Sequence, residues 1–223
     1  MNMRLRMAAG LGAMVLVVGG INTAPLAAQV QVTPFFASYY PVGNLGQGND
    51  TEGNPWEALQ SQGLGFGAAF SYMFSDALGV EIGGSYIFSN AVFRTCGAVA
   101  CGATAPGLLK GGVILGQLSL KFRPRGTNFF LVLGPALAYR SGKAWGADWF
   151  ALSGSEKMGF GGMAGLGVIA RVAPKLAVDV RVEVYGYSFD VDGADGIPSL
   201  GTNFSSKFRP DVVLKVGLPF PAR

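Results

Sequence analysis

The segment from Leu176 to Ser188 reads LAVDVRVEVYGYS, and two kinds of residue alternate along it. Its even positions are mostly valine, while Asp179, Arg181 and Glu183 occupy odd positions. Because successive side chains of a β-strand point to opposite faces of the sheet, one face of this strand is apolar and the other is charged. Such a strand separates an apolar environment from a polar one.

The same alternation recurs along the rest of the chain. Over the strands that follow the first one, the apolar positions carry no Asp, Glu, Lys or Arg. A Lys or Arg on such a face would cost about 2–4 kcal/mol at the middle of a bilayer, so this exclusion favours a face in contact with hydrocarbon. With the segment quoted above, the alternating segments are residues 30–40, 64–74, 80–88, 114–123, 129–140, 161–173 and 207–218.

The connections between these segments are alternately short and long. Short periplasmic turns alternating with long external loops are typical of outer-membrane barrels. We therefore predict an all-β fold, an antiparallel up-and-down transmembrane β-barrel of about eight strands. The short links are 75–77, 124–127 and 173–175, and the long ones are 41–62, 91–111, 141–157 and 190–206.

The N-terminus has the three parts of a secretory signal peptide. A retained membrane anchor is the alternative, but the apolar run is shorter than the roughly 20 residues that a spanning helix needs. We expect residues 1–28 to be a signal peptide, cleaved after Ala28, and residues 29–223 to form the outer-membrane β-barrel domain. The three parts are the cations Arg4 and Arg6, the apolar residues 8–21 and the small-residue segment 25–28.

With its signal peptide, its loop alternation and a final strand that ends Lys215-Val216-Gly217-Leu218-Pro219-Phe220, the chain resembles the small outer-membrane barrels of the OmpA/OmpX type. The resemblance implies an outer-membrane location and a terminal aromatic residue that the barrel assembly machinery reads. Here Phe220 is followed by Pro221-Ala222-Arg223, which departs from that pattern.

The charged positions of the strands point to the interior of the predicted barrel. An eight-stranded barrel is just wide enough for side chains to fill it, and buried charges must be paired or hydrated. We therefore expect a salt-bridge network that plugs the lumen, with a narrow channel for small solutes as the alternative. The residues are Glu81, Lys121, Arg171, Asp179, Arg181, Glu183, Arg209, Asp211 and Lys215.

Enzymatic activity is not expected. Asp179 and Glu183 could be an acid/base pair, but Arg181 lies between them on the same face, so ion pairing is the simpler explanation. Barrel enzymes that modify lipid A or cleave proteins rely on a catalytic histidine, and this chain contains none. No cofactor or metal site is predicted.

The long loops carry two further features. We expect Cys96 and Cys101 to form a disulfide in an oxidising compartment, with two free thiols or a metal pair as alternatives. Trp56, Trp145 and Trp149 either pack within the loops or mark a recognition surface for an extracellular protein or an envelope partner.

The other expected partners are outer-membrane lipid, lipopolysaccharide and the assembly machinery. No run of Lys or Arg indicates nucleic acid.

Three further expectations concern packing. Aromatic residues cluster near the strand ends, and interfacial girdles are expected to account for most of them. They are Phe35, Phe36, Tyr39, Tyr40, Phe74, Tyr86, Phe88, Phe129, Phe130, Tyr139, Phe160, Tyr185, Tyr187, Phe208 and Phe220. Pro135 should produce a bulge or local break, because it lacks a backbone donor. The glycines at 63, 65, 67, 161, 165 and 167 should relieve crowding on the inner face.

Besides the closed membrane barrel and the narrow channel, a soluble lipocalin-like barrel is a third possible reading of the sequence. Such a barrel would need an apolar lumen to hold a ligand.

Overall fold

The computed structural model describes residues 30–42, 46–49, 55–96, 101–102, 110–142, 158–189 and 208–221. Within these ranges the chain forms strands and turns, and no helix among them is long and apolar enough to cross a membrane. The predicted signal peptide, residues 1–28, lies outside the described residues.

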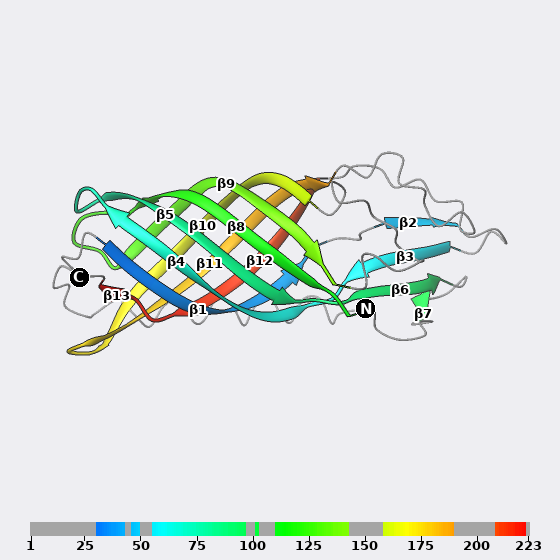
Figure 1. Cartoon of the computed structure of the whole chain (residues 1–223), viewed down its shortest axis with the longest axis horizontal. Coiled ribbons are helices and arrows are strands. Elements are labelled where there is room, and N and C mark those ends of the chain that lie inside the picture. Colours follow the sequence, from blue (N-terminus) through cyan, green and yellow to red (C-terminus); the bar gives the residue numbers. More distant parts are fainter. Residues whose placement is uncertain are drawn as a thin grey trace.

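Eight long antiparallel strands form a closed barrel (Figure 1). Each long strand pairs with the long strands that come before and after it in the chain, and β12 closes the barrel by pairing with β1. The short β13 (Phe220–Pro221) pairs with the beginning of β1. The predicted up-and-down barrel is therefore confirmed. Its strands are β1 (Val30–Pro41), β4 (Gly63–Met73), β5 (Leu78–Phe88), β8 (Gly112–Phe122), β9 (Phe129–Ser141), β10 (Met158–Ala173), β11 (Leu176–Phe189) and β12 (Phe208–Gly217).

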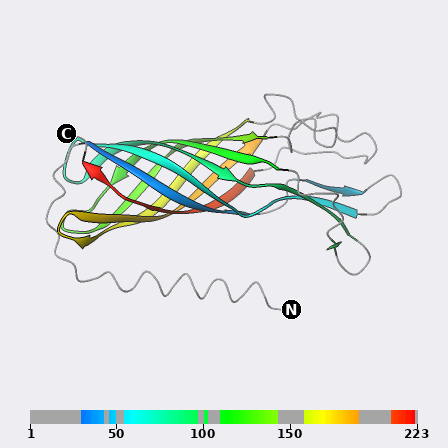
Figure 2. The same cartoon turned by 60° about the horizontal axis from the view of Figure 1, so that its bottom comes forward.

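The strands are strongly staggered. Following the paired residues once around the barrel from Val30 leads back to β1 at Tyr40, ten positions further along the same strand. A stagger of this size goes with strands tilted by roughly 35–45° to the barrel axis. The tilt is visible in Figure 2.

Burial alternates along every long strand, as the sequence pattern predicts. The outward side chains form an apolar surface, on which Phe36 is 78% exposed and Leu64 is 69% exposed. The charged residues of the alternating strands are on the opposite, buried face; Glu81 and Arg181 are 0% and 1% exposed. This arrangement is the reverse of a soluble barrel with an apolar lumen and fits a barrel whose outer wall contacts lipid.

The two ends of the barrel differ. Three short turns, residues 74–77, 123–128 and 174–175, lie at the same end as β13. At the opposite end a separate four-stranded sheet extends beyond the barrel (Figure 1). The sequence alone predicts only loops in this part of the chain. The sheet has the order β2 (Gly46–Asn49), β3 (Pro55–Gln60), β6 (Ala91–Cys96) and β7 (Cys101–Gly102).

Five of the aromatic side chains lie inside the barrel. The position of these residues near strand ends had indicated interfacial girdles instead. Each is on the inward-facing side of its strand, so these five are exceptions to the prediction that girdles hold most of the aromatics. The five are Phe35, Tyr39, Phe130, Tyr185 and Tyr187, all at most 5% exposed.

Pro135 interrupts the pairing of β9 without shifting it. The pairs with β8 stop at Gln117↔Ala136 and resume at Leu120↔Leu133 in the same register. On its other side Pro135 is paired with Gly162 without interruption. The ladder therefore has a local break, since proline cannot donate a hydrogen bond, and the predicted bulge or local break at Pro135 takes the second form.

Candidate functional site

Six ionisable side chains meet in the barrel interior. They come from four strands, and the alternation of each strand turns them away from the lipid-facing surface. Three are acids and three are bases, so the formal charges balance. The six are Glu81 on β5, Lys121 on β8, Asp179, Arg181 and Glu183 on β11, and Lys215 on β12, each at most 2% exposed.

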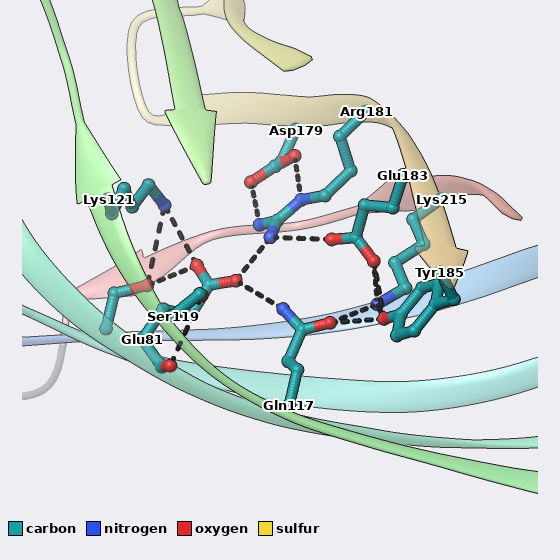
Figure 3. A network of polar contacts seen from close by, with 10 residues as sticks. Glu81, Gln117, Ser119, Lys121, Asp179, Arg181, Glu183, Tyr185 and Lys215 are labelled. Atoms are coloured by element: carbon teal, nitrogen blue, oxygen red, sulfur yellow. Dashed lines mark hydrogen bonds and ion pairs between the residues drawn. The ribbon is translucent and has the colours of Figure 1, made fainter. Parts of the chain in front are cut away.

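Arg181 is at the centre of this network (Figure 3). Its Nε donates to Asp179 Oδ1 at 2.9 Å, and its Nη2 donates to Asp179 Oδ2 at 2.5 Å. Its Nη1 donates to Glu81 Oε1 and lies 3.5 Å from Glu183 Oε1. The planar guanidinium thus contacts three carboxylates at once, with a bidentate contact to one of them, a geometry that lysine cannot provide.

The carboxylate of Glu81 has three further partners besides Arg181. Lys121 Nζ lies 3.1 Å from its Oε2, and Ser71 Oγ donates to the same oxygen at 2.7 Å. Gln117 Nε2 donates to Glu81 Oε1 at 3.2 Å. Both carboxylate oxygens therefore have partners, as a fully buried charge requires.

Lys215 and Tyr185 extend the network from Glu183. Lys215 Nζ lies 2.5 Å from Glu183 Oε2 and donates to the Tyr185 hydroxyl at 2.9 Å. The Tyr185 hydroxyl is 2.7 Å from the same Glu183 oxygen and also contacts Gln117 Oε1. Gln117 Oε1 accepts from Lys215 Nζ at 3.1 Å as well. Gln117 therefore joins the two halves of the network, since its amide nitrogen binds Glu81.

Two of these contacts cross the barrel. Strand β5, which carries Glu81, is separated from β11, which carries Arg181, by three strands in either direction around the barrel. The same is true of β8 and β12, which carry Gln117 and Lys215. The side chains of diametrically opposite strands thus meet inside the barrel (Figure 3).

The three cations of the network lie over aromatic rings. Lys121 Nζ lies 4.5 Å from the centroid of the Phe130 ring, and the Arg181 guanidinium carbon lies 5.0 Å from it. Lys215 Nζ lies 4.6 Å from the centroid of Phe35. Contacts of this kind stabilise a desolvated cation through the negative face of the ring.

Glycines make room for these two rings. A Cβ atom added to Gly167 would lie within 3.0 Å of the Phe130 ring, and one added to Gly67 would lie within 3.0 Å of the Phe35 ring. Each glycine therefore leaves room for the ring of the residue with which it is paired on the neighbouring strand. The crowding predicted for these two glycines comes from the aromatic rings and, at Gly67, also from the backbone oxygen of Gly84.

A second polar cluster lies nearer the loop end of the barrel. The Tyr39 hydroxyl donates to Asp211 Oδ2 at 2.5 Å and lies 3.4 Å from the Tyr187 hydroxyl. Arg140, near the end of β9, is buried as well. Arg140 occupies an inward position of its strand and is an interior charge beyond those predicted from the sequence.

The remaining predicted residues lie outside the central network. Arg171 is half-buried near the short-turn end, next to the register shift between Arg171 and Ala173. Arg209 and Trp56 belong to β12 and β3, but their side chains are outside the described residues, as are Trp145 and Trp149 entirely.

Cys96 and Cys101 face each other as a backbone pair of β6 and β7. Their side chains are outside the described residues, so the disulfide stays a prediction.

Four members of the network were not selected from the sequence. Gln117 and Ser71 are uncharged, and Tyr185 and Phe130 resembled girdle residues. Their inward positions in strands were the available signal.

No protein-family model and no curated protein matches this chain. Among solved structures, the outer membrane protein AlkL in lipid bilayers superposes with a TM-score of 0.51 at 15% identity, covering 90% of this chain and 93% of AlkL. The attachment invasion locus protein Ail of Yersinia pestis gives a TM-score of 0.42 at 14% identity, over 86% of this chain and 99% of Ail. Neisserial surface protein A gives 0.39 at 14% identity, over 87% and 98%. The likeness to AlkL shows the fold, that of a small transmembrane barrel of the OmpA/OmpX type.

Proposed function

We propose that this barrel is exported to the outer membrane, has no enzymatic activity, keeps its lumen closed, and meets its partners through the long loops on the cell surface. The observation that carries the proposal is the neutral network that joins opposite strands inside the barrel. Glu81 and Arg181, and Gln117 and Lys215, occupy the space that a solute would have to cross. In a barrel of eight strands, little room remains beside such side chains.

The absence of activity is supported by the chemistry of the buried groups. A general acid or base must reach a substrate atom, directly or through one water. The carboxylates of Glu81 and Asp179 are instead held by cations that are themselves buried. The chain has no histidine to act as a base.

With the lumen closed, the loop end is the part of the molecule that can reach an external partner. The sheet of β2, β3, β6 and β7 projects from this end and would extend above the membrane. We propose a disulfide between Cys96 and Cys101 at the β6–β7 pair of this sheet. Trp56, Trp145 and Trp149 are the proposed recognition residues for an extracellular protein or for an envelope component such as lipopolysaccharide.

Two experiments test the location and the orientation. The protein should require detergent and migrate differently on gels before and after boiling, whereas a protein that stays soluble and monomeric without detergent would contradict membrane insertion. Trypsin added to intact cells should cut at the loop end, near Lys110, and leave the turn at Arg125 uncut. Cleavage at Arg125 alone would reverse the orientation.

The surface role is tested with Trp145→Ala and Trp149→Ala variants that assemble normally. Lipopolysaccharide micelles and immobilised extracellular-matrix proteins are the probes. Reduced binding by either variant supports the recognition role, and unchanged binding assigns the tryptophans to loop packing.

A further inference from the structure

Four cations gather at the short-turn end of the barrel. Arg123 and Arg125 belong to the turn between β8 and β9, and Arg171 and Lys175 belong to the end of β10 and the turn that follows it. Arg125 and Lys175 are exposed, while Arg123 and Arg171 are half-buried. We call these four residues the basic collar.

The two turns follow one another around the same end of the barrel. Strands β9 and β10 are neighbours, and the backbone N–H of Ile169 on β10 donates to the carbonyl of Asn128 in the first turn at 2.9 Å. The collar is therefore a one-sided patch over β8 to β11. Because like charges repel, a cluster of this kind is stabilised by an anionic partner.

Little negative charge lies nearby in the described part of the chain. Asp76, in the neighbouring turn between β4 and β5, is the one acidic residue of the three short turns, so the collar keeps an excess of positive charge. Among the described residues, no carboxylate forms an ion pair with any of the four cations.

Each part of the collar borders the lipid-facing surface. Phe122 precedes Arg123 and is 44% exposed, and Leu176 follows Lys175 and is 43% exposed. Val172, next to Arg171, is 58% exposed. A cation directly beside exposed apolar side chains at the end of a membrane-spanning strand is at the depth of lipid headgroups.

We propose that the basic collar binds anionic phospholipid headgroups, with the acyl chains lying against Phe122, Val172 and Leu176. A phosphatidylglycerol headgroup carries a net negative charge, whereas a phosphatidylcholine headgroup brings its own cation and gains less from the patch. This inference rests on the proposed membrane insertion. It adds a lipid preference at the periplasmic end that the closed barrel alone does not require.

The test uses the full-length mature barrel reconstituted in phosphatidylcholine vesicles with spin-labelled phosphatidylglycerol or spin-labelled phosphatidylcholine as probes. The fraction of motionally restricted label gives the relative association of each lipid with the protein. We expect phosphatidylglycerol to be preferred by about threefold and the preference to fall in high salt, as headgroup electrostatics requires. A wild-type preference close to one would overturn the proposal.

The variants locate the effect. The double variant Arg125→Gln/Lys175→Gln should lose most of the preference, while Lys110→Gln, an exposed cation at the opposite end, should keep it. Retention of the full preference by the double variant would exclude the collar. At equal ionic strength, inorganic phosphate should lower the preference no more than chloride does, and a larger loss with phosphate would indicate a free-anion site instead. A protein that fails to insert shows no heat-modifiable band, which separates failure of the proposed function from failure of this inference.

Discussion

The guanidinium of Arg181 on β11 reaches the carboxylate of Glu81 on β5, the strand directly across the barrel. Strands β5 and β11 are not neighbours and share no backbone hydrogen bonds, so this contact links two opposite sides of the barrel. Both side chains are almost completely buried. The interior is therefore held by side-chain charges as well as by the sheet.

Arg181→Met should be strongly destabilising. The substitution fills part of the space but leaves the charges of Asp179 and Glu81 without their main partner, and breaking a buried ion pair on one side costs about 3–5 kcal/mol. Urea unfolding of the protein in vesicles measures the change. The matched control is Arg125→Met in an exposed turn, which should change stability little. Equal stability of the two variants would mean that the contacts of Arg181 contribute nothing to the free energy of unfolding.

Glu183 and Lys215 should be energetically coupled. Their ion pair is 2.5 Å long and is buried on both sides. Each single variant, Glu183→Gln or Lys215→Met, leaves one charge without its nearest partner, whereas the double variant removes both charges. We expect a coupling of about 1–3 kcal/mol in a double-mutant cycle of unfolding free energies. Additive effects would show that the two charges find other partners.

Gly167→Ala should destabilise the barrel, because the new methyl group overlaps the ring of Phe130. Overpacking of this kind costs about 1–3 kcal/mol. The control is Gly84→Ala on the outer face, where a Cβ atom meets only a backbone oxygen, Leu115 O, at 3.7 Å. That variant should be neutral or slightly more stable. The urea midpoints of the two variants give the comparison, and a reversed order would refute the packing of Phe130 on Gly167.

Cys96 and Cys101 should resist alkylation until a reductant is added. They occupy directly paired backbone positions in β6 and β7, where a disulfide can form across the two strands. Maleimide labelling followed by mass spectrometry should find no label on the unreduced mature protein and two labels after reduction. Cys101→Ser serves as the control and should take one label without reductant. Two labels on the unreduced protein would show free thiols.

The barrel could be predicted from sequence because lipid excludes charge so strongly. On β11, Asp179, Arg181 and Glu183 alternate with valines, and this pattern alone defines both faces of the strand. The interior positions of Glu81 and Lys215 follow from the same rule. The choice of partners does not, since it depends on the stagger of the strands around the closed barrel. Arg171 and Asp211 share the inward face but lie outside the central network.

The misplaced aromatics had a usable signal. Phe35-Phe36, Tyr39-Tyr40 and Phe129-Phe130 are adjacent pairs, and in a strand one member of each pair must point inward. Proximity to a strand end obscured this alternation. The sheet of β2, β3, β6 and β7 left no comparable pattern, because strands outside the membrane have no lipid-facing side to keep apolar.

The central claim is that the network around Arg181 closes the lumen. Recording currents across a planar phosphatidylcholine bilayer that contains the folded protein tests it most directly. We predict no sustained ohmic conductance for the wild type and a measurable conductance when Arg181 and Glu81 are both replaced by alanine. Sustained ohmic conductance of the wild type, altered when Arg181 or Glu183 is neutralised, would contradict a closed barrel and establish a narrow channel.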